Sequence, residues 1–197
     1  MTSVRTNIEV LSRARRLPAE ERARLLDDVV EQLGEMTALV SELIELARGE
    51  QQPHEPEDVR LDAVVDAAVQ RARRRMPYVR FTTDLRESVV RGVPASIERA
   101  VGNLLDNAAK WSPPGGEVDV AVVNGSVVVR DHGPGIAAED LPFVFDRFYR
   151  AESARGMPGS GLGLAIVRQV AEAHGGGVSV EAANGGGTAV TLRLGSS

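Results

Sequence analysis

The stretch that decides the fold reads VDVAVVNGSVVVRD and covers residues 118–131. Two valine-rich runs, 118–123 and 127–131, flank the pair Asn124-Gly125. Valine favours extended backbone, and both asparagine and glycine tolerate the positive φ that a two-residue hairpin turn needs. Residues 118–131 are therefore predicted to form two antiparallel strands.

Working outward from this hairpin, strands and helices alternate without a repeating βαβ pattern. Helical spacing of apolar residues covers 95–111, begun by Pro94, and returns at about 162–174. The remaining expected elements are strands at 59–61, 79–84, 89–92, 178–182 and 188–194 and a helix at 62–75. The predicted fold class is α+β, a mixed sheet covered by helices on one face, that is, a two-layer α/β sandwich.

The N-terminal part has a different pattern. From Pro18 to Arg48 apolar residues recur three and four apart, as in a heptad seam, and 4–11 has the same spacing. We expect residues 1–48 to be a helical hairpin whose first helix is only partly present, residues 49–58 a polar linker, and residues 59–197 the main domain. On periodicity alone, an ordinary amphipathic helix pair packed on its own domain is the favoured alternative.

Composition excludes several classes of protein. The 197 residues carry a net charge of -5 and no cysteine, so neither a thiolate metal site nor a disulfide framework is possible. An acidic chain lacks the excess of Lys and Arg that binds nucleic-acid phosphates, so no nucleic-acid partner is expected. No apolar run approaches the roughly 20 residues that cross a bilayer, so we expect a cytoplasmic chain without membrane contact.

The helix at 95–111 carries polar side chains on one face. Asn103, Asn107 and Lys110 are four and three residues apart, which places them together on that face. An amide oxygen can coordinate Mg²⁺, and a lysine can neutralise a phosphate. Taken alone, a solvated helix face is the alternative interpretation.

Two glycine-containing segments follow. Residues 131–136 read DHGPGI: a carboxylate at the end of a strand can accept a hydrogen bond from an exocyclic amine, and glycines let the backbone approach a flat ring, which suits adenine. Residues 159–164 read GSGLGL at the start of a helix, where unpaired N–H groups bind anions. The first could also be an ordinary strand-ending turn. The second is neither a Rossmann nor a Walker loop, and residues 150–158 before it are typical of a mobile lid.

In this order, the Asn-rich helix, DHGPGI, the segment FDRFYR at 145–150, GSGLGL and Gly186-Gly187-Thr188 resemble the N, G1, F, G2 and G3 boxes of sensor histidine kinases. The resemblance covers essentially the whole chain and has the character of actinobacterial envelope-stress kinases. It implies a Bergerat-type ATP-binding fold preceded by a remnant of the dimerising hairpin.

The resemblance also implies roles for individual residues. Asn103 and Lys110 are expected to be catalytic, and Asn107 is the expected metal ligand, with ATP and Mg²⁺ as cofactors. The remaining nucleotide contacts are expected from Trp111, Asp131, Gly133, Gly135, Ile136, Phe145, Arg147, Arg150, Gly159, Ser160, Gly161, Leu162, Gly163, Leu164 and Thr188. Phe145 and Phe148 resemble a hydrophobic latch for the lid, with local packing as the alternative. Trp111 stands where the family more often has Tyr or Phe.

None of the three histidines has the sequence context of the family's phosphorylated histidine. His54 is in the linker, His132 follows Asp131, and His174 ends a helix where a cation suits the dipole. We therefore expect this chain, as a truncated kinase, to bind ATP without phosphorylating itself. The parent kinase would dimerise through the hairpin, be anchored in the cell membrane and transfer phosphoryl groups to a response-regulator receiver domain. A serine kinase of anti-sigma type and a nucleotide-binding regulatory module without kinase activity are the alternatives.

Overall fold

The computed structural model describes residues 55–154, 157, 159–183 and 186–195. The chain divides into two units, one made of Gln52–Arg155 with Gly161–Ser197 and the other of Met1–Gln51 with Gly156–Ser160. The expected helical hairpin at 1–48 lies outside the described residues. Everything that follows concerns the first unit, with the exception of Gly159 and Ser160.

The described elements follow the order expected from the sequence. They are β1 (Glu57–Arg60), α3 (Leu61–Arg75), β2 (Arg80–Leu85), β3 (Val89–Gly92), α4 (Pro94–Trp111), β4 (Glu117–Val123), β5 (Ser126–Asp131), the short 3₁₀ helix η1 (Glu152–Ala154), α5 (Gly163–Ala173), β6 (Gly177–Ala182) and β7 (Thr188–Arg193). All the predicted strands and helices of this part are confirmed, with ends that shift by one or two residues. β1 begins at Glu57, inside the range expected to be linker.

A five-stranded sheet forms one layer, with the strand order β2-β4-β5-β7-β6. β2 and β4 run parallel, and the other neighbouring strands are antiparallel, so the sheet is mixed as predicted. The β4–β5 hairpin turns through Asn124 and Gly125, whose φ values are 49° and 74°. These are the positive φ values that the Asn-Gly pair was expected to supply. β1 and β3 form a separate antiparallel pair.

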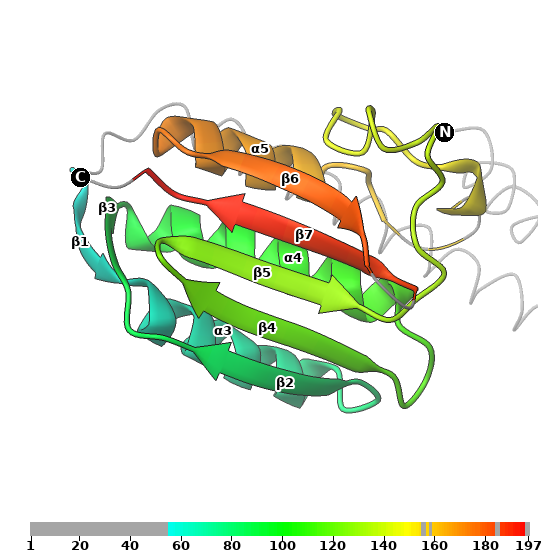
Figure 1. The fold of residues 1–197 in the computed structure, drawn as a ribbon, viewed down its shortest axis with the longest axis horizontal. Helices are drawn as coiled ribbons and strands as arrows, with labels where there is room; N and C mark the ends of the chain where they lie inside the picture. Colours follow the sequence, from blue (N-terminus) through cyan, green and yellow to red (C-terminus); the bar gives the residue numbers. More distant parts are fainter. Residues whose placement is uncertain (1–54, 155–156, 158, 184–185, 196–197) are drawn as a thin grey trace, which may run out of the picture. The chain divides into compact units, whose positions relative to one another are not determined.

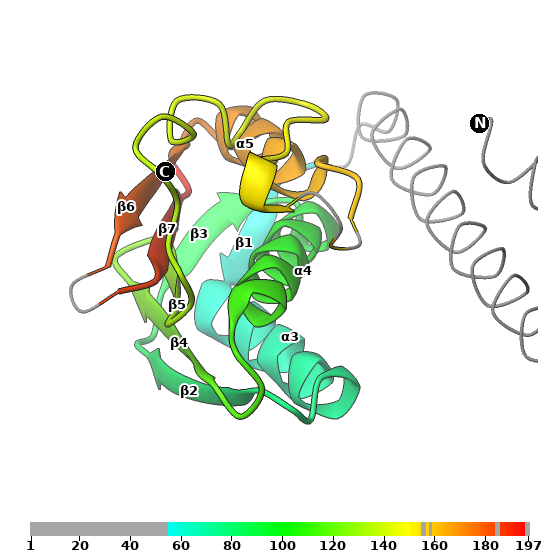
Figure 2. The ribbon, with the colours of Figure 1, turned by 90° about the vertical axis from the view of Figure 1, so that its right-hand side faces the viewer.

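The helices α3, α4 and α5 form the second layer and cover one face of the sheet (Figures 1 and 2). Side chains alternate along β4 and β5, so that Val118, Val120 and Val122 are buried while their neighbours are less so. α4 lies behind the middle of the sheet and buries Ile97, Val101, Leu104 and Leu105. The predicted two-layer arrangement is confirmed. No described helix is long and apolar enough to span a bilayer.

Candidate functional site

Four chain segments reach the same end of the sheet (Figure 1): the ends of β5 and α4 and the beginnings of β7 and α5. β5 and β7 are paired up to Arg130 and Ala189. α4 and α5 approach each other at Asn103 and Gly163. A Cβ atom added to Gly163 would lie 3.6 Å from Oδ1 of Asn103. This end of the sheet collects most of the residues that the sequence singled out.

Asp131 is the buried carboxylate of this end. It continues the inward-facing positions of β5 after Val127 and Val129, and the residue is only 3% exposed. Its Oδ1 accepts hydrogen bonds from the backbone N–H groups of Gly133 and Thr188, at 2.9 and 3.2 Å. Burial raises the pKa of this carboxyl, although the backbone hydrogen bonds from Gly133 and Thr188 act to lower it. Because both backbone donors use Oδ1, Oδ2 is the oxygen through which the group can accept from a ligand.

Glycines make the close approach of these segments possible. A Cβ on Gly133 would lie 2.4 Å from the carbonyl oxygen of Trp111, and one on Gly187 would lie 2.0 Å from that of Asp131. Gly135 and Gly187 also have positive φ, 81° and 90°. Ile136, between the turn and the exposed residues after it, is half-buried. A side chain at either close-approach position would therefore separate β5 from α4 or β7.

The polar face of α4 points away from the buried positions of the helix. Asn103, Asn107 and Lys110 are all partly exposed, whereas Leu104, Leu105 and Ala108 between them are buried. Gly163, the first residue of α5, lies beside Asn103. Leu162 before it is buried, and Leu164 is half-buried. The helix start, where N–H groups lack partners within the helix, thus lies next to the amide face of α4.

Lys110 has another cation as its electrostatic neighbour. Burial lowers the pKa of Lys110, and the positive charge of Arg150 lowers it further. Nζ of Lys110 lies 5.8 Å from the ring centre of Trp111, and Nη2 of Arg150 donates to the carbonyl oxygen of Ala154 at 2.7 Å. Two cations held near each other create a local positive potential that attracts an anion.

The segment 140–150 contacts the start of α5. Phe148 has a φ of 66°, and its N–H donates to the carbonyl oxygen of Gly161 at 3.0 Å. Gly161 itself has a φ of 76°, and a Cβ there would lie 2.8 Å from the backbone of Phe148. Phe148 is 57% exposed, so the expected latch role of this side chain is not seen in packing. Phe145 is half-buried and Arg147 is exposed.

Two interactions of this segment were missed by the sequence analysis. The hydroxyl of Tyr149 donates to Oδ1 of Asp140 at 2.6 Å, which raises the pKa of that tyrosine. Arg168 of α5 lies 3.6 Å from Asp146. A loop without periodicity carries no signal for such pairs. Gly159 and Ser160 belong to the other unit.

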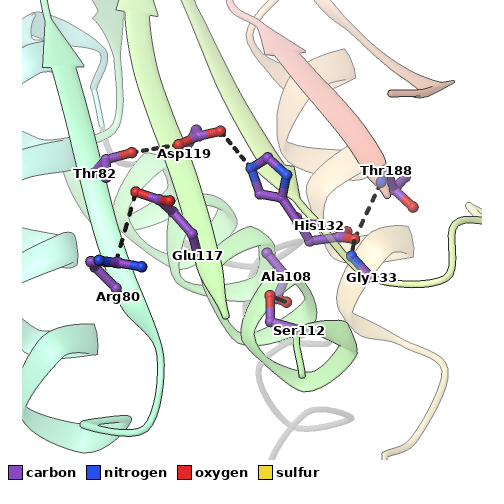
Figure 3. A network of polar contacts seen from close by, with 10 residues as sticks. Arg80, Thr82, Ala108, Ser112, Glu117, Asp119, His132, Gly133 and Thr188 are labelled. Atoms are coloured by element: carbon purple, nitrogen blue, oxygen red, sulfur yellow. Dashed lines mark hydrogen bonds and ion pairs between the residues drawn. The ribbon is translucent and has the colours of Figure 1, made fainter. Parts of the chain in front are cut away.

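A polar cluster on the outer face of the sheet was missed as well (Figure 3). Oδ2 of Asp119 lies 2.8 Å from Nε2 of His132, and Oδ1 accepts from Oγ1 of Thr82 at 2.5 Å. Burial acts to raise the pKa of Asp119, but hydrogen bonds from Thr82 and His132 and the charges of His132 and Arg130 outweigh it and lower the pKa. Only the alternation of faces along β4 hinted at this cluster.

The donor set suits a metal ion that arrives with a phosphate ligand. Within the described ranges, no group of three or more acidic, histidine or cysteine side chains could hold a metal by itself. The amide oxygens of Asn103 and Asn107 are neutral and partly exposed. Mg²⁺ is commonly bound by few protein oxygens, with waters and phosphate oxygens completing its shell.

Comparison with known proteins gave consistent matches. The pattern of the histidine kinase-, DNA gyrase B- and HSP90-like ATPases matches residues 92–196. The signal transduction histidine-protein kinase/phosphatase MprB of Mycolicibacterium vanbaalenii is 45% identical over 198 residues, which cover 95% of this chain and 41% of that protein. Its namesake from Mycobacterium avium is 47% identical over 193 residues, covering 92% of this chain and 37% of that protein. The chain spans about two fifths of the length of these relatives.

Solved structures agree with these matches. A structure of the mycobacterial sensor histidine kinase MprB is 45% identical, with a TM-score of 0.65 over 70% of this chain and 97% of that one. The ATP binding domain of PrrB from Mycobacterium tuberculosis is 26% identical, with a TM-score of 0.59 over 73% and 99% of the two chains.

Proposed function

The chain belongs to the sensor histidine kinases of the histidine kinase-, DNA gyrase B- and HSP90-like ATPase family, and from this premise we propose that residues 59–197 bind ATP for phosphoryl transfer to a histidine. Residues 1–48 are proposed to belong to the dimerising hairpin and 49–58 to be the linker. The serine-kinase alternative receives no support, because the relatives compared above are histidine kinases.

The observation that carries this proposal is the buried carboxylate of Asp131. Its Oδ1 is held by two backbone N–H groups, so the group has one orientation. We propose that Oδ2 accepts from the exocyclic amine of adenine, which distinguishes adenine from a base that presents a carbonyl there. We propose that the ring is lined by residues of this turn and its neighbours. Gly133 and Thr188 hold Asp131, and Trp111 lies against Gly133. Gly135 and Ile136 follow in the same turn.

The phosphate end of the site is proposed to be the amide face of α4 and the start of α5. Lys110 and Arg150 would neutralise phosphate oxygens, and the electrostatic repulsion between the two cations would be relieved by that anion. Gly161, Leu162, Gly163 and Leu164 would offer backbone N–H groups, together with Gly159 and Ser160. Phe145 and Arg147 lie in the segment 140–150, which precedes α5, and we propose that they cover the bound nucleotide.

Asn107, assisted by Asn103, is the proposed holder of Mg²⁺. The bound ion would neutralise charge on the phosphates. Asn103 and Lys110 are the residues proposed to act on the γ-phosphoryl group, by orienting it and by stabilising its charge as it leaves ATP. The acceptor would be an imidazole nitrogen in the dimerising hairpin, and a response-regulator aspartate would take the group next. We propose that this chain alone does not phosphorylate itself, and that the whole protein is a membrane-anchored dimer.

Titration calorimetry of Mg-ATP into the wild-type chain and Asp131→Asn tests the proposal. Wild type should bind saturably, and the variant should bind at least about tenfold more weakly, since a hydrogen bond to a charged group is worth about 1.5–3 kcal/mol. Asp84→Asn is the matched control: Asp84 is an exposed carboxylate on β2, and the change removes the same charge. Its affinity should equal that of wild type.

Two outcomes would contradict the proposal. One is absence of Mg-ATP binding by folded wild type, which would leave Asp131 without a ligand. The other is equal affinity of wild type and Asp131→Asn, which would place the nucleotide elsewhere. A Mg-GTP titration completes the design, because a site that relies on the exocyclic amine of adenine should bind GTP far more weakly.

A further inference from the structure

A second set of contacts holds the Asp131 turn from the opposite face of the sheet. Figure 3 shows Thr82 on β2, Asp119 on β4 and His132 just after β5 in one line across the outer face. Both oxygens of the Asp119 carboxylate are used, Oδ1 by Thr82 and Oδ2 by His132. The cluster therefore joins two strands to the residue that follows Asp131.

His132 lies where the backbone ladders stop. The β4–β5 register ends with Val118 opposite Asp131, and the β5–β7 register ends with Arg130 opposite Ala189. Residue 132 is thus the first one beyond both ladders, and the described polar contact of its side chain is the one to Asp119. Consecutive residues of an extended segment point to opposite faces, so His132 is anchored outside while Asp131 points inside.

The position of residue 132 bears directly on the carboxylate. Residue 132 lies between Asp131 and Gly133. The N–H of Gly133 donates to Oδ1 of Asp131. A turn that swings outward at residue 132 would draw this donor away and change the orientation of the carboxylate. The contact to Asp119 opposes such a swing.

We propose that Asp119 is a positioning residue that, by binding His132, holds the Asp131 turn in its adenine-binding conformation. This deepens the function proposed above and rests on it. Nucleotide affinity would then depend on the contact between Asp119 and His132.

The charges around His132 favour its contact with Asp119. Asp119 faces it from β4, and Arg130 and Asp131 flank it on β5, while Arg80 of β2 and Glu117 of β4 form a 3.9 Å ion pair on the same outer face. Protonated His132 lowers the pKa of Asp119 and acts to lower that of Asp131. The imidazolium therefore favours the ionised forms of both carboxyl groups.

The experiment measures Mg-ATP affinity by calorimetry at one pH for wild type, His132→Gln, Asp119→Asn and the double variant. Glutamine keeps a donor but cannot be charged, and asparagine removes the charged acceptor. Because both single variants break the same contact, comparison with the double variant measures the coupling between His132 and Asp119. The charge-matched control is Asp84→Asn, on the same outer face of β2.

In each of His132→Gln and Asp119→Asn, the dissociation constant for Mg-ATP should be about two to five times that of wild type, the size expected for a solvent-exposed ion pair. The double variant should lose no more affinity than the weaker-binding single variant, because both act through one contact. The affinity of Asp84→Asn should equal that of wild type. Wild-type affinity in either single variant, or additive losses in the double variant, in protein that melts as wild type does, would overturn the inference. If wild type itself bound no Mg-ATP, the proposed function would fail instead, so the two failures are distinguishable.

Discussion

The backbone N–H of Thr188 donates to Oδ1 of Asp131, joining the first residue of β7 to the last residue of β5 across 57 positions of sequence. The N–H of Gly133 donates to the same oxygen from within the turn. The carboxylate is thus fixed by the scaffold while its second oxygen can serve a ligand. A buried charge held in this way has a cost for stability as well as a use in binding.

Replacing Asp131 by asparagine should separate these two effects. Burial raises the pKa of this carboxyl, so ionising it at neutral pH destabilises the folded state. Asparagine keeps an oxygen for the two N–H donors without the charge, and the variant should have an equal or higher free energy of unfolding at pH 7. The difference in free energy of unfolding between the variant and wild type should shrink as the pH falls toward the ordinary carboxyl pKa of 3.8, because the Asp131 side chain of wild type then becomes neutral as well. Urea unfolding at several pH values measures it, and a clear loss of stability at pH 7 would contradict the argument.

Two glycines of the same region give a matched pair of substitutions. Gly133→Ala brings a Cβ to within 2.4 Å of the Trp111 carbonyl oxygen, whereas Gly102→Ala, on α4, meets nothing within 4 Å. Overpacking against backbone should cost about 2 kcal/mol of stability. The helical substitution should instead stabilise by about 0.5–1 kcal/mol. Thermal melts of both variants test this, and similar melting temperatures would show that the turn can move away from α4.

Local patterns in the sequence were enough to predict the elements of the fold, but not which distant residues meet. Valine runs and Asn124-Gly125 predicted the hairpin because strand period and turn chemistry are local properties. The parallel pairing of β2 with β4 is a choice between partners with the same pattern, and no local signal decides it. The polar face of α4 was predicted for the same reason as the hairpin, since its spacing is periodic.

Close approaches were the least predictable part of the candidate site. Gly187 was singled out only within the segment 186–188 that resembles the G3 box, yet it lies against the Asp131 carbonyl oxygen. Nothing in the spacing of Thr82, Asp119 and His132 relates them, because their contact depends on the register of three strands. Periodicity assigns a residue to a face, whereas the neighbour on that face depends on the register.

Lys110 should be needed for nucleotide and not for folding. Burial and the charge of Arg150 both disfavour its protonated form, so Lys110→Met should leave the free energy of unfolding at pH 7 unchanged or raised. Loss of a charge-assisted contact to phosphate should weaken Mg-ATP binding by about tenfold or more. Adenosine, which lacks phosphates, should bind wild type and variant alike. An equal loss for adenosine and Mg-ATP would mean that the variant has disturbed the whole site.

Asp62, at the start of α3, should contribute stability that acid removes. Hydrogen bonds from Arg60 lower the pKa of Asp62 from 3.8 to about 2. Burial acts to raise this pKa, and the hydrogen bond from the N–H of Ser88 acts to lower it. A lowered carboxyl pKa gives stability that is complete above pH 3.8 and is lost as the pH falls toward 2. Because Arg60 is 53% exposed, solvent screening reduces the value, and Asp62→Asn should cost about 1 kcal/mol at pH 7. Urea unfolding of both proteins should show the difference at pH 7 and its decline below pH 3.8; a constant difference would contradict the assignment.

His174 joins the end of α5 to the start of α4 through two contacts of its ring nitrogens. Its Nε2 lies 3.0 Å from the N–H of Val93, the residue before α4, and its Nδ1 lies 2.7 Å from the carbonyl oxygen of Val170. An N–H donor needs an acceptor, so the geometry fits the neutral tautomer that carries its proton on Nδ1. A Cβ on Gly92 would lie 2.5 Å from the ring, which explains why glycine stands there.

Two variants of His174 separate its hydrogen bonds from its packing. His174→Phe keeps a ring of similar shape but leaves the N–H of Val93 without its acceptor, which should cost about 1–2 kcal/mol. His174→Ala loses the packing as well and should cost more. Urea unfolding at neutral pH measures both differences from wild type. A His174→Phe variant as stable as wild type would show that the ring contributes by packing alone, and that the start of α4 does not depend on this acceptor.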